Sequence, residues 1–158
     1  MRSLYLALAV LAAPLIPASV FAGSSSPPNF SGSWQLDAAK SPQAGGRNIT
    51  LNIQDNSGKI DFTRVVRDRD GKEVKSTFTC DTVGTQCVFD EGSHKAKVSL
   101  WYDGPALVIL KTDGPKEDAV TQWRLEMAPD GNSLKVQFDH IDPTDKSETF
   151  VFDKKSPT

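Results

Sequence analysis

The chain has 158 residues, and its 18 lysine and arginine residues nearly balance its 20 aspartate and glutamate residues, for a formal net charge of −2. This balance leaves no electrostatic footprint for nucleic acid or for an anionic membrane surface, so we expect neither as a partner. A chain of this length is expected to form one domain that buries a hydrophobic core.

The first 22 residues have the pattern of an export signal. Arg2 supplies a positive start, and the apolar run LYLALAVLAAPLI is too short to span a bilayer comfortably. The residues up to Ala22 predict cleavage between Ala22 and Gly23, and an uncleaved membrane anchor is the alternative. We therefore expect an exported protein, periplasmic or secreted, with no membrane span after signal removal. Residues 23–29 then form a flexible linker, and residues 30–155 a single domain.

Cys80 and Cys87 are the only cysteines, and they flank a turn near Gly84. A hairpin could bring them within the distance that a disulfide tolerates. Export favours pairing, because exported proteins meet oxidising conditions. A redox role is the alternative, but the C-x₆-C spacing lacks the C-x-x-C geometry that lowers a thiol pKa. The sequence therefore favours a structural disulfide.

Turn signals divide the remaining chain into short segments. Asp-Gly pairs and similar turns recur about 8 to 17 residues apart, the spacing of consecutive strands. Within the segments apolar and polar residues alternate, which indicates an antiparallel sheet with one dry face. Only LDAAKSP could hold a helical turn, and Pro42 is expected to end it. The expected strands are residues 32–37, 47–55, 59–69, 72–81, 85–90, 94–102, 105–112, 118–128, 133–140 and 146–154.

Short connections predict that sequential strands pair, which makes the topology an up-and-down meander. An open sheet of this many strands would leave two long edges, and closure into a barrel removes them. A Greek-key sandwich is the alternative, but it needs long crossovers that this chain lacks. The fold class we expect is therefore all-β, an antiparallel meander of about 8–10 strands closed into a barrel.

The stretch NFSGSWQLDAAKS, residues 29–41, resembles the start of a known family of β-barrels. Its Gly32 and Trp34 are similar to the G-x-W signature on the first strand of lipocalins and related calycin barrels, and the longer stretch resembles lipocalin-like domains of bacterial exported proteins. The resemblance implies a lipocalin-like barrel in which the tryptophan closes one end and packs on a basic side chain from a late strand. The candidates for that side chain are Arg124 and the pair Lys154 and Lys155.

The sequence contains no nucleophile elbow, phosphate loop or zinc-protease motif. His94 and His140 are the only histidines, and nothing in their spacing brings them together. We therefore expect no metal, no cofactor and no enzymatic activity.

Arg64 is the first candidate ligand contact. It alternates with Phe62 and Val66, so it belongs to a face that is otherwise apolar. A buried arginine is costly unless it is paired, and inside a barrel it would suit a carboxylate such as that of a fatty acid. A place at the rim, or a supporting role beside Trp34, is the alternative.

Ser76, His94 and Tyr102 are further candidates, because they also fall on apolar-face positions. A pocket needs a few such polar groups to orient its ligand. The resemblance implies a monomeric, non-catalytic binder of a small apolar or amphipathic molecule. The alternative is a protein-interaction module, such as an inhibitor or an envelope-associated barrel with a filled core.

Overall fold

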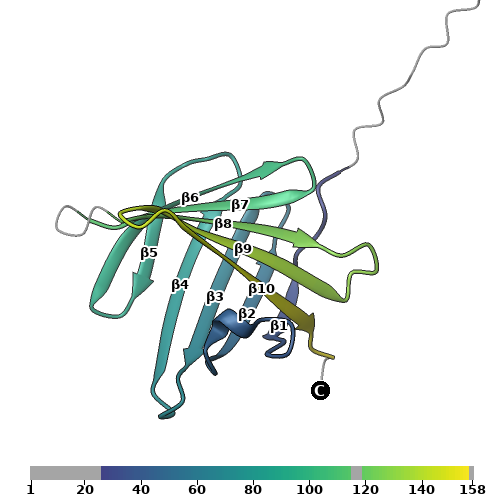
Figure 1. Ribbon diagram of the computed structural model, residues 1–158. Helices are drawn as coiled ribbons and strands as arrows, with labels where there is room; N and C mark the ends of the chain where they lie inside the picture. Colours follow the sequence, from purple (N-terminus) through teal and green to yellow (C-terminus); the bar gives the residue numbers. More distant parts are fainter. Residues whose placement is uncertain (1–25, 115–118, 157–158) are drawn as a thin grey trace, which may run out of the picture.

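The computed structural model describes residues 26–114 and 119–156 (Figure 1). The expected export signal, its cleavage point between Ala22 and Gly23, and the first linker residues lie outside this range. Within the described residues, no helix is long and apolar enough to cross a membrane.

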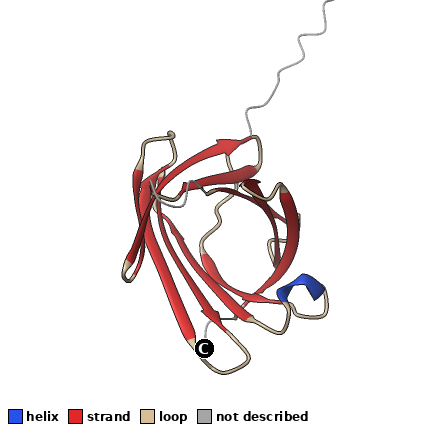
Figure 2. Cartoon of the chain, turned by 60° about the vertical axis from the view of Figure 1, so that its left-hand side comes forward, coloured by secondary structure: helices blue, strands red, loops and turns tan. Residues whose placement is uncertain are grey.

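Ten antiparallel strands pair in chain order, and β1 closes the ring by pairing with both β2 and β10 (Figure 2). The expected all-β meander barrel is therefore confirmed, and each expected strand ends within two residues of an observed one. The strands are β1 (Gly32–Leu36), β2 (Asn48–Asp55), β3 (Lys59–Arg67), β4 (Glu73–Asp81), β5 (Cys87–Glu91), β6 (His94–Asp103), β7 (Ala106–Thr112), β8 (Val120–Met127), β9 (Ser133–Asp142) and β10 (Lys146–Lys154).

The single helical element of the described ranges is the 3₁₀ turn η1 (Pro42–Ala44), which lies outside the ring of strands (Figure 2). It begins at Pro42, so the expectation that this proline ends a helical turn was wrong. Proline suits the first helical position, because its missing N–H would have no partner there. The Ser41 hydroxyl accepts a hydrogen bond from the Val151 N–H at 2.8 Å, which fastens the segment before η1 to β10.

The third strand ends two residues earlier than expected because of its turn chemistry. The Asp68 carboxylate accepts hydrogen bonds from the backbone N–H groups of Asp70 (3.0 Å) and Lys72 (2.8 Å). Gly71 follows with a φ of 82°, a conformation that costs a glycine little. Side-chain bonding of this kind favours a turn over continued strand.

The ladder is thinnest between β4 and β5, where Thr77 and Asp90 form the one register pair. The Cys80–Cys87 disulfide joins the same two strands, with Cα atoms 5.7 Å apart. The expected disulfide is therefore confirmed, and it ties the barrel where backbone pairing is weakest.

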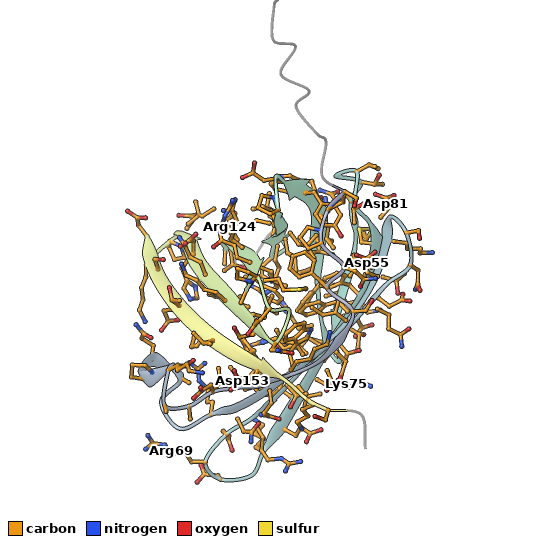
Figure 3. The ribbon with its side chains drawn as sticks, turned by 90° about the vertical axis from the view of Figure 1, so that its right-hand side faces the viewer. Asp55, Arg69, Lys75, Asp81, Arg124 and Asp153 are labelled. Carbon is orange, nitrogen blue, oxygen red and sulfur yellow. A yellow bond between two sulfur atoms is a disulfide. The ribbon has the colours of Figure 1, made fainter. Side chains whose placement is uncertain are left out.

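Alternate connections of a meander lie at alternate ends of the barrel. The β1–β2, β3–β4, β5–β6 and β9–β10 connections share one end, which we call the cavity end and which faces the left and bottom of Figure 1. Arg69 and Lys75 lie at the cavity end, and Asp55 and Asp81 lie at the other, which we call the closed end (Figure 3).

Candidate ligand-binding cavity

A cavity of about 190 Å³ lies inside one half of the barrel, between β2 and β3 on one side and β8, β9 and β10 on the other. Strand alternation turns every second side chain inward, so each of these strands contributes two or three residues to the wall. Most of the wall is apolar, and the charged or titratable residues in it are Arg47, Arg64, His140 and Glu148. The apolar wall consists of Ile49, Leu51, Phe62, Trp123, Leu125, Val136, Phe138, Phe150 and Phe152.

Arg64 is a charged residue that lies among these apolar side chains, beside Leu51 on β2 and over the Trp123 ring on β8. It pairs in register with Leu51 and Ser76, and its guanidinium carbon lies 5.7 Å from the centre of the Trp123 ring. In the described ranges, Arg67 and Arg124 form ion pairs with carboxylates, whereas Arg64 forms neither an ion pair nor a side-chain hydrogen bond.

Burial lowers the pKa of the Arg64 guanidinium, the charge of Glu91 opposes that shift, and the charge of Arg47 adds to it. An arginine starts from a pKa far above neutral, so the group stays protonated at neutral pH. Cation–π attraction to Trp123 stabilises it only in part, typically by about 1–2 kcal/mol. The cavity therefore contains a positive charge whose hydrogen-bond donors are not used by the described residues.

Arg47 brings a second guanidinium to the cavity wall. Its Nε donates to the Ala44 carbonyl at 2.8 Å and its Nη2 to the Gln43 carbonyl at 3.4 Å, so η1 holds the side chain in place. Arg47 precedes Ile49 and Leu51 at an alternating position, and this spacing could have identified it from the sequence.

Glu148 on β10 lies diagonally across from His140 on β9. The His140 Nε2 lies 3.5 Å from one Glu148 oxygen, and the Lys146 ammonium lies 2.9 Å from the other. The hydrogen bond from Lys146 lowers the pKa of the Glu148 carboxyl below its ordinary value; burial opposes this effect and His140 adds to it. Glu148 alternates with Phe150 and Phe152, which was the sequence signal for its inward position.

The pH dependence of stability tests this arrangement through Glu148→Gln. A carboxyl whose folded pKa is depressed stabilises the fold fully above its unfolded pKa of about 4.3, and loses that contribution as pH falls through the lowered folded value. Thermal melts from about pH 7 to about pH 3 should show the wild type more stable at neutral pH, with the difference closing in acid. A difference that is constant across this range would contradict the ion pair.

The other three predicted ligand contacts point inward but do not line the cavity. Ser76 is fully buried and donates its hydroxyl to the Glu91 carboxylate. His94 Nε2 lies 2.8 Å from the Asp113 carboxylate. Of the four candidate contacts, the structure thus brings Arg64 alone to the cavity wall.

Tyr102 lies at the closed end. Its hydroxyl donates to the Asp55 carboxylate at 2.8 Å, and its ring stacks on Phe30 with centroids 6.3 Å apart. Burial raises the pKa of the Tyr102 hydroxyl, and the hydrogen bond to Asp55 raises it further. Tyr102 therefore acts as a structural donor at the end away from the cavity.

The Asp113 carboxylate forms ion pairs with His94 and Lys111 at the cavity end of the barrel. Burial raises its pKa, but hydrogen bonds from Lys111 and His94 outweigh burial and leave the pKa lowered. The Lys111 ammonium lies 2.7 Å from the same oxygen that His94 contacts. These groups link β6 and β7 at the rim.

Trp34 lies in the barrel core and packs on a basic side chain from a late strand. Its ring is fully buried, its Nε1 donates to the Phe30 carbonyl at 3.1 Å, and the Lys154 ammonium lies 5.2 Å from the ring centre. Gly32 has a φ of 153°, a conformation that other residues rarely adopt, and a Cβ there would lie 2.9 Å from the Lys154 Cε. Of the basic candidates, Lys154 is thus the partner, and Arg124 pairs instead with Asp103 at 2.6 Å.

Two buried polar atoms, Thr121 Oγ1 and Trp123 Nε1, have no hydrogen-bond partner within the described part of the chain. Replacing a buried unsatisfied hydroxyl by a methyl group of the same shape removes a desolvation cost, so Thr121→Val is expected to raise stability by about 1 kcal/mol. Ser76→Ala is the opposite case, because it breaks a bond to a carboxylate and should cost about 1.5 kcal/mol or more. Urea denaturation measures the free energy of unfolding of both variants, which should rise for Thr121→Val and fall for Ser76→Ala. A destabilised Thr121→Val would show that the Thr121 hydroxyl is not an unpaired buried group.

The comparisons with known proteins place the fold. No family model and no curated protein matches the chain. Among solved structures, it is similar to the REP1-NXSQ fatty acid transporter (12% identity, TM-score 0.60, 81% of this chain and 97% of that one). It is also similar to apo lipid binding protein 8 of Caenorhabditis elegans (10% identity, TM-score 0.58, 80% of this chain and 95% of that one). A mutant of the fluorescent protein UnaG is similar as well (18% identity, TM-score 0.55, 81% of this chain and 97% of that one).

These identities are low, so the likeness describes the backbone and not the ligand. Together with the closed ten-stranded ring, it shows that the chain has the calycin-like β-barrel fold of these structures. The resemblance drawn from Gly32 and Trp34 is therefore confirmed at the level of fold.

Proposed function

We propose that this protein is a lipocalin-like, non-catalytic binder of a small amphipathic molecule, with the cavity as its ligand site and Arg64 as the anchor for a carboxylate. The observation that carries the proposal is a guanidinium among apolar side chains with no ion pair in the described ranges. A partly buried charge of this kind is costly, and a ligand carboxylate would supply an ion-pair partner for it.

The charges around the cavity support an acidic ligand. Arg47 and Arg64 both contribute positive charge to the wall, and the one carboxylate in it, Glu148, is already engaged by Lys146 and His140. The rest of the wall is aliphatic and aromatic, which suits an apolar body. Two of the structural neighbours are named as a fatty acid transporter and a lipid binding protein, which agrees with this ligand class.

The test is calorimetric titration of the folded domain with octanoate, with 1-octanol as the neutral match. Wild-type protein should bind octanoate, and Arg64→Met should weaken that binding at least tenfold, since a hydrogen bond to a charged group contributes about 1.5–3 kcal/mol. The same substitution should raise the melting temperature, because it removes a partly buried charge that forms no ion pair in the described ranges. A side chain with only a structural role would instead lose stability when replaced.

Arg67→Met is the matched control, because Arg67 is exposed on the same strand and pairs with Glu73. It should leave octanoate binding unchanged. Binding of 1-octanol as tight as that of octanoate would overturn the anchor role of Arg64. Failure of every apolar acid to bind would favour the alternative, a protein-interaction barrel.

We further propose that the protein works after export, as a monomer in the periplasm or outside the cell. The confirmed disulfide supports this location, because such bonds persist in oxidising compartments. Native mass spectrometry of protein from the exported fraction tests it. The expected mass is that of a chain starting at Gly23 with one disulfide, and any further mass that disappears on denaturation would be the ligand.

A further inference from the structure

We propose that the apolar part of the ligand is compact, about the size of one aromatic ring, and that long alkyl chains are excluded. This inference rests on the proposed function, because it specifies the ligand of the same cavity. It sets this barrel apart from the lipid-named structural neighbours, with which it shares only the fold.

The volume of the cavity is the first argument. Pockets for drug-sized ligands typically enclose about 300–1,000 Å³, whereas a cavity of about 150 Å³ suffices for benzene. The cavity here measures about 190 Å³, room for one ring and a short acidic substituent. A chain of sixteen carbons would have to displace side chains or remain largely outside.

The filled half of the barrel is the second argument. Behind the cavity wall, Phe78 stacks on Phe62 with centroids 4.8 Å apart, and Phe89 packs edge-on against Trp123 at 6.2 Å. Phe78 and Phe89 are both at most 5% exposed. Interiors packed in this way resist insertion of further carbon atoms, so the cavity does not extend across the barrel.

The composition of the wall is the third argument. Phe62, Trp123 and Phe138 form a continuous aromatic surface, with centroids 5.7 Å and 5.4 Å apart. Aromatic rings attract one another beyond the effect of area burial when they approach at such distances. The Arg64 guanidinium lies above Trp123 in the same wall, so a ring resting here would have its carboxylate close to the cation.

The experiment compares phenylacetate, octanoate and palmitate by calorimetry on the same folded domain, with benzyl alcohol as the uncharged ring. We expect phenylacetate to bind at least tenfold more tightly than palmitate, with octanoate between them, and benzyl alcohol to bind at least tenfold more weakly than phenylacetate. Palmitate binding equal to or tighter than phenylacetate would overturn this inference and leave the proposed function standing. Absence of binding by all three acids would overturn both.

Phe62→Leu provides a second test, since it removes one ring from the wall and enlarges the cavity. The ratio of phenylacetate to palmitate affinity should fall at least threefold in this variant. Phe30→Leu is the control, because Phe30 is equally buried but lies outside the cavity wall, and it should leave the ratio unchanged. An unchanged ratio in Phe62→Leu, with circular dichroism showing a folded barrel, would contradict the role of the aromatic wall.

Discussion

Replacing Trp34 by alanine is expected to destabilise the barrel by about 3–5 kcal/mol, the range for large aromatic side chains removed from a packed core. The ring is fully buried, and it also supplies the hydrogen bond to Phe30 and the surface on which Lys154 rests. A domain of this size has a total stability of roughly 5–15 kcal/mol, so the variant should be near the limit of folding. Urea denaturation followed by circular dichroism measures the loss.

Trp34→Phe separates packing from the hydrogen bond. It keeps an aromatic ring but removes the N–H, so it should cost less than the alanine variant and leave the Phe30 carbonyl unpaired. Trp101→Ala is the control, because Trp101 is partly exposed and is absent from the core cluster. If Trp34→Ala cost no more than Trp101→Ala, Trp34 would not be a principal contact of the core.

Removing the disulfide is expected to have the second largest effect. Cys80→Ala combined with Cys87→Ala opens a loop of eight residues, which in the chain-entropy model costs about 2.5 kcal/mol. β4 and β5 share one register pair, Thr77 and Asp90, so backbone hydrogen bonds between these strands would stabilise them little once the disulfide is removed. Thermal melts should show a lower transition temperature for the double variant.

Reduction of the wild type provides an independent measurement of the same bond. Dithiothreitol should lower the transition temperature of the wild type toward that of the double variant and should not affect the variant itself. If reduction left the wild type unchanged, the bond would contribute nothing to stability. Octanoate binding should persist in the double variant, because neither cysteine lines the cavity.

Much of the barrel could be predicted from local patterns. Alternation places Arg64 inward whatever the strand is paired with, because successive side chains of a strand point to opposite faces. Turn residues such as Gly71 mark where the chain reverses. The role of Trp34 followed from its resemblance to a known signature, but its partner did not, because only closure brings β10 alongside β1 and sets Trp34 opposite Lys154.

The cavity depended on contacts that no local pattern encodes. Ser76 and Tyr102 point inward like Arg64, yet one is bound to Glu91 and the other lies at the closed end. Facing inward is a property of strand period, whereas position along the barrel axis depends on tilt and register across all ten strands.

The sequence by itself determined the strands, their order and the side chains that face inward, because these follow from backbone conformation and a two-residue period. The tertiary structure decided which half of the barrel is filled and which is hollow, because that depends on the summed volumes of side chains from distant strands. Phe89 lies behind the cavity wall and packs against the wall residue Trp123, although 34 positions separate them in the sequence. Arg64 faces the hollow half, where the remaining space and the uncompensated charge define the site.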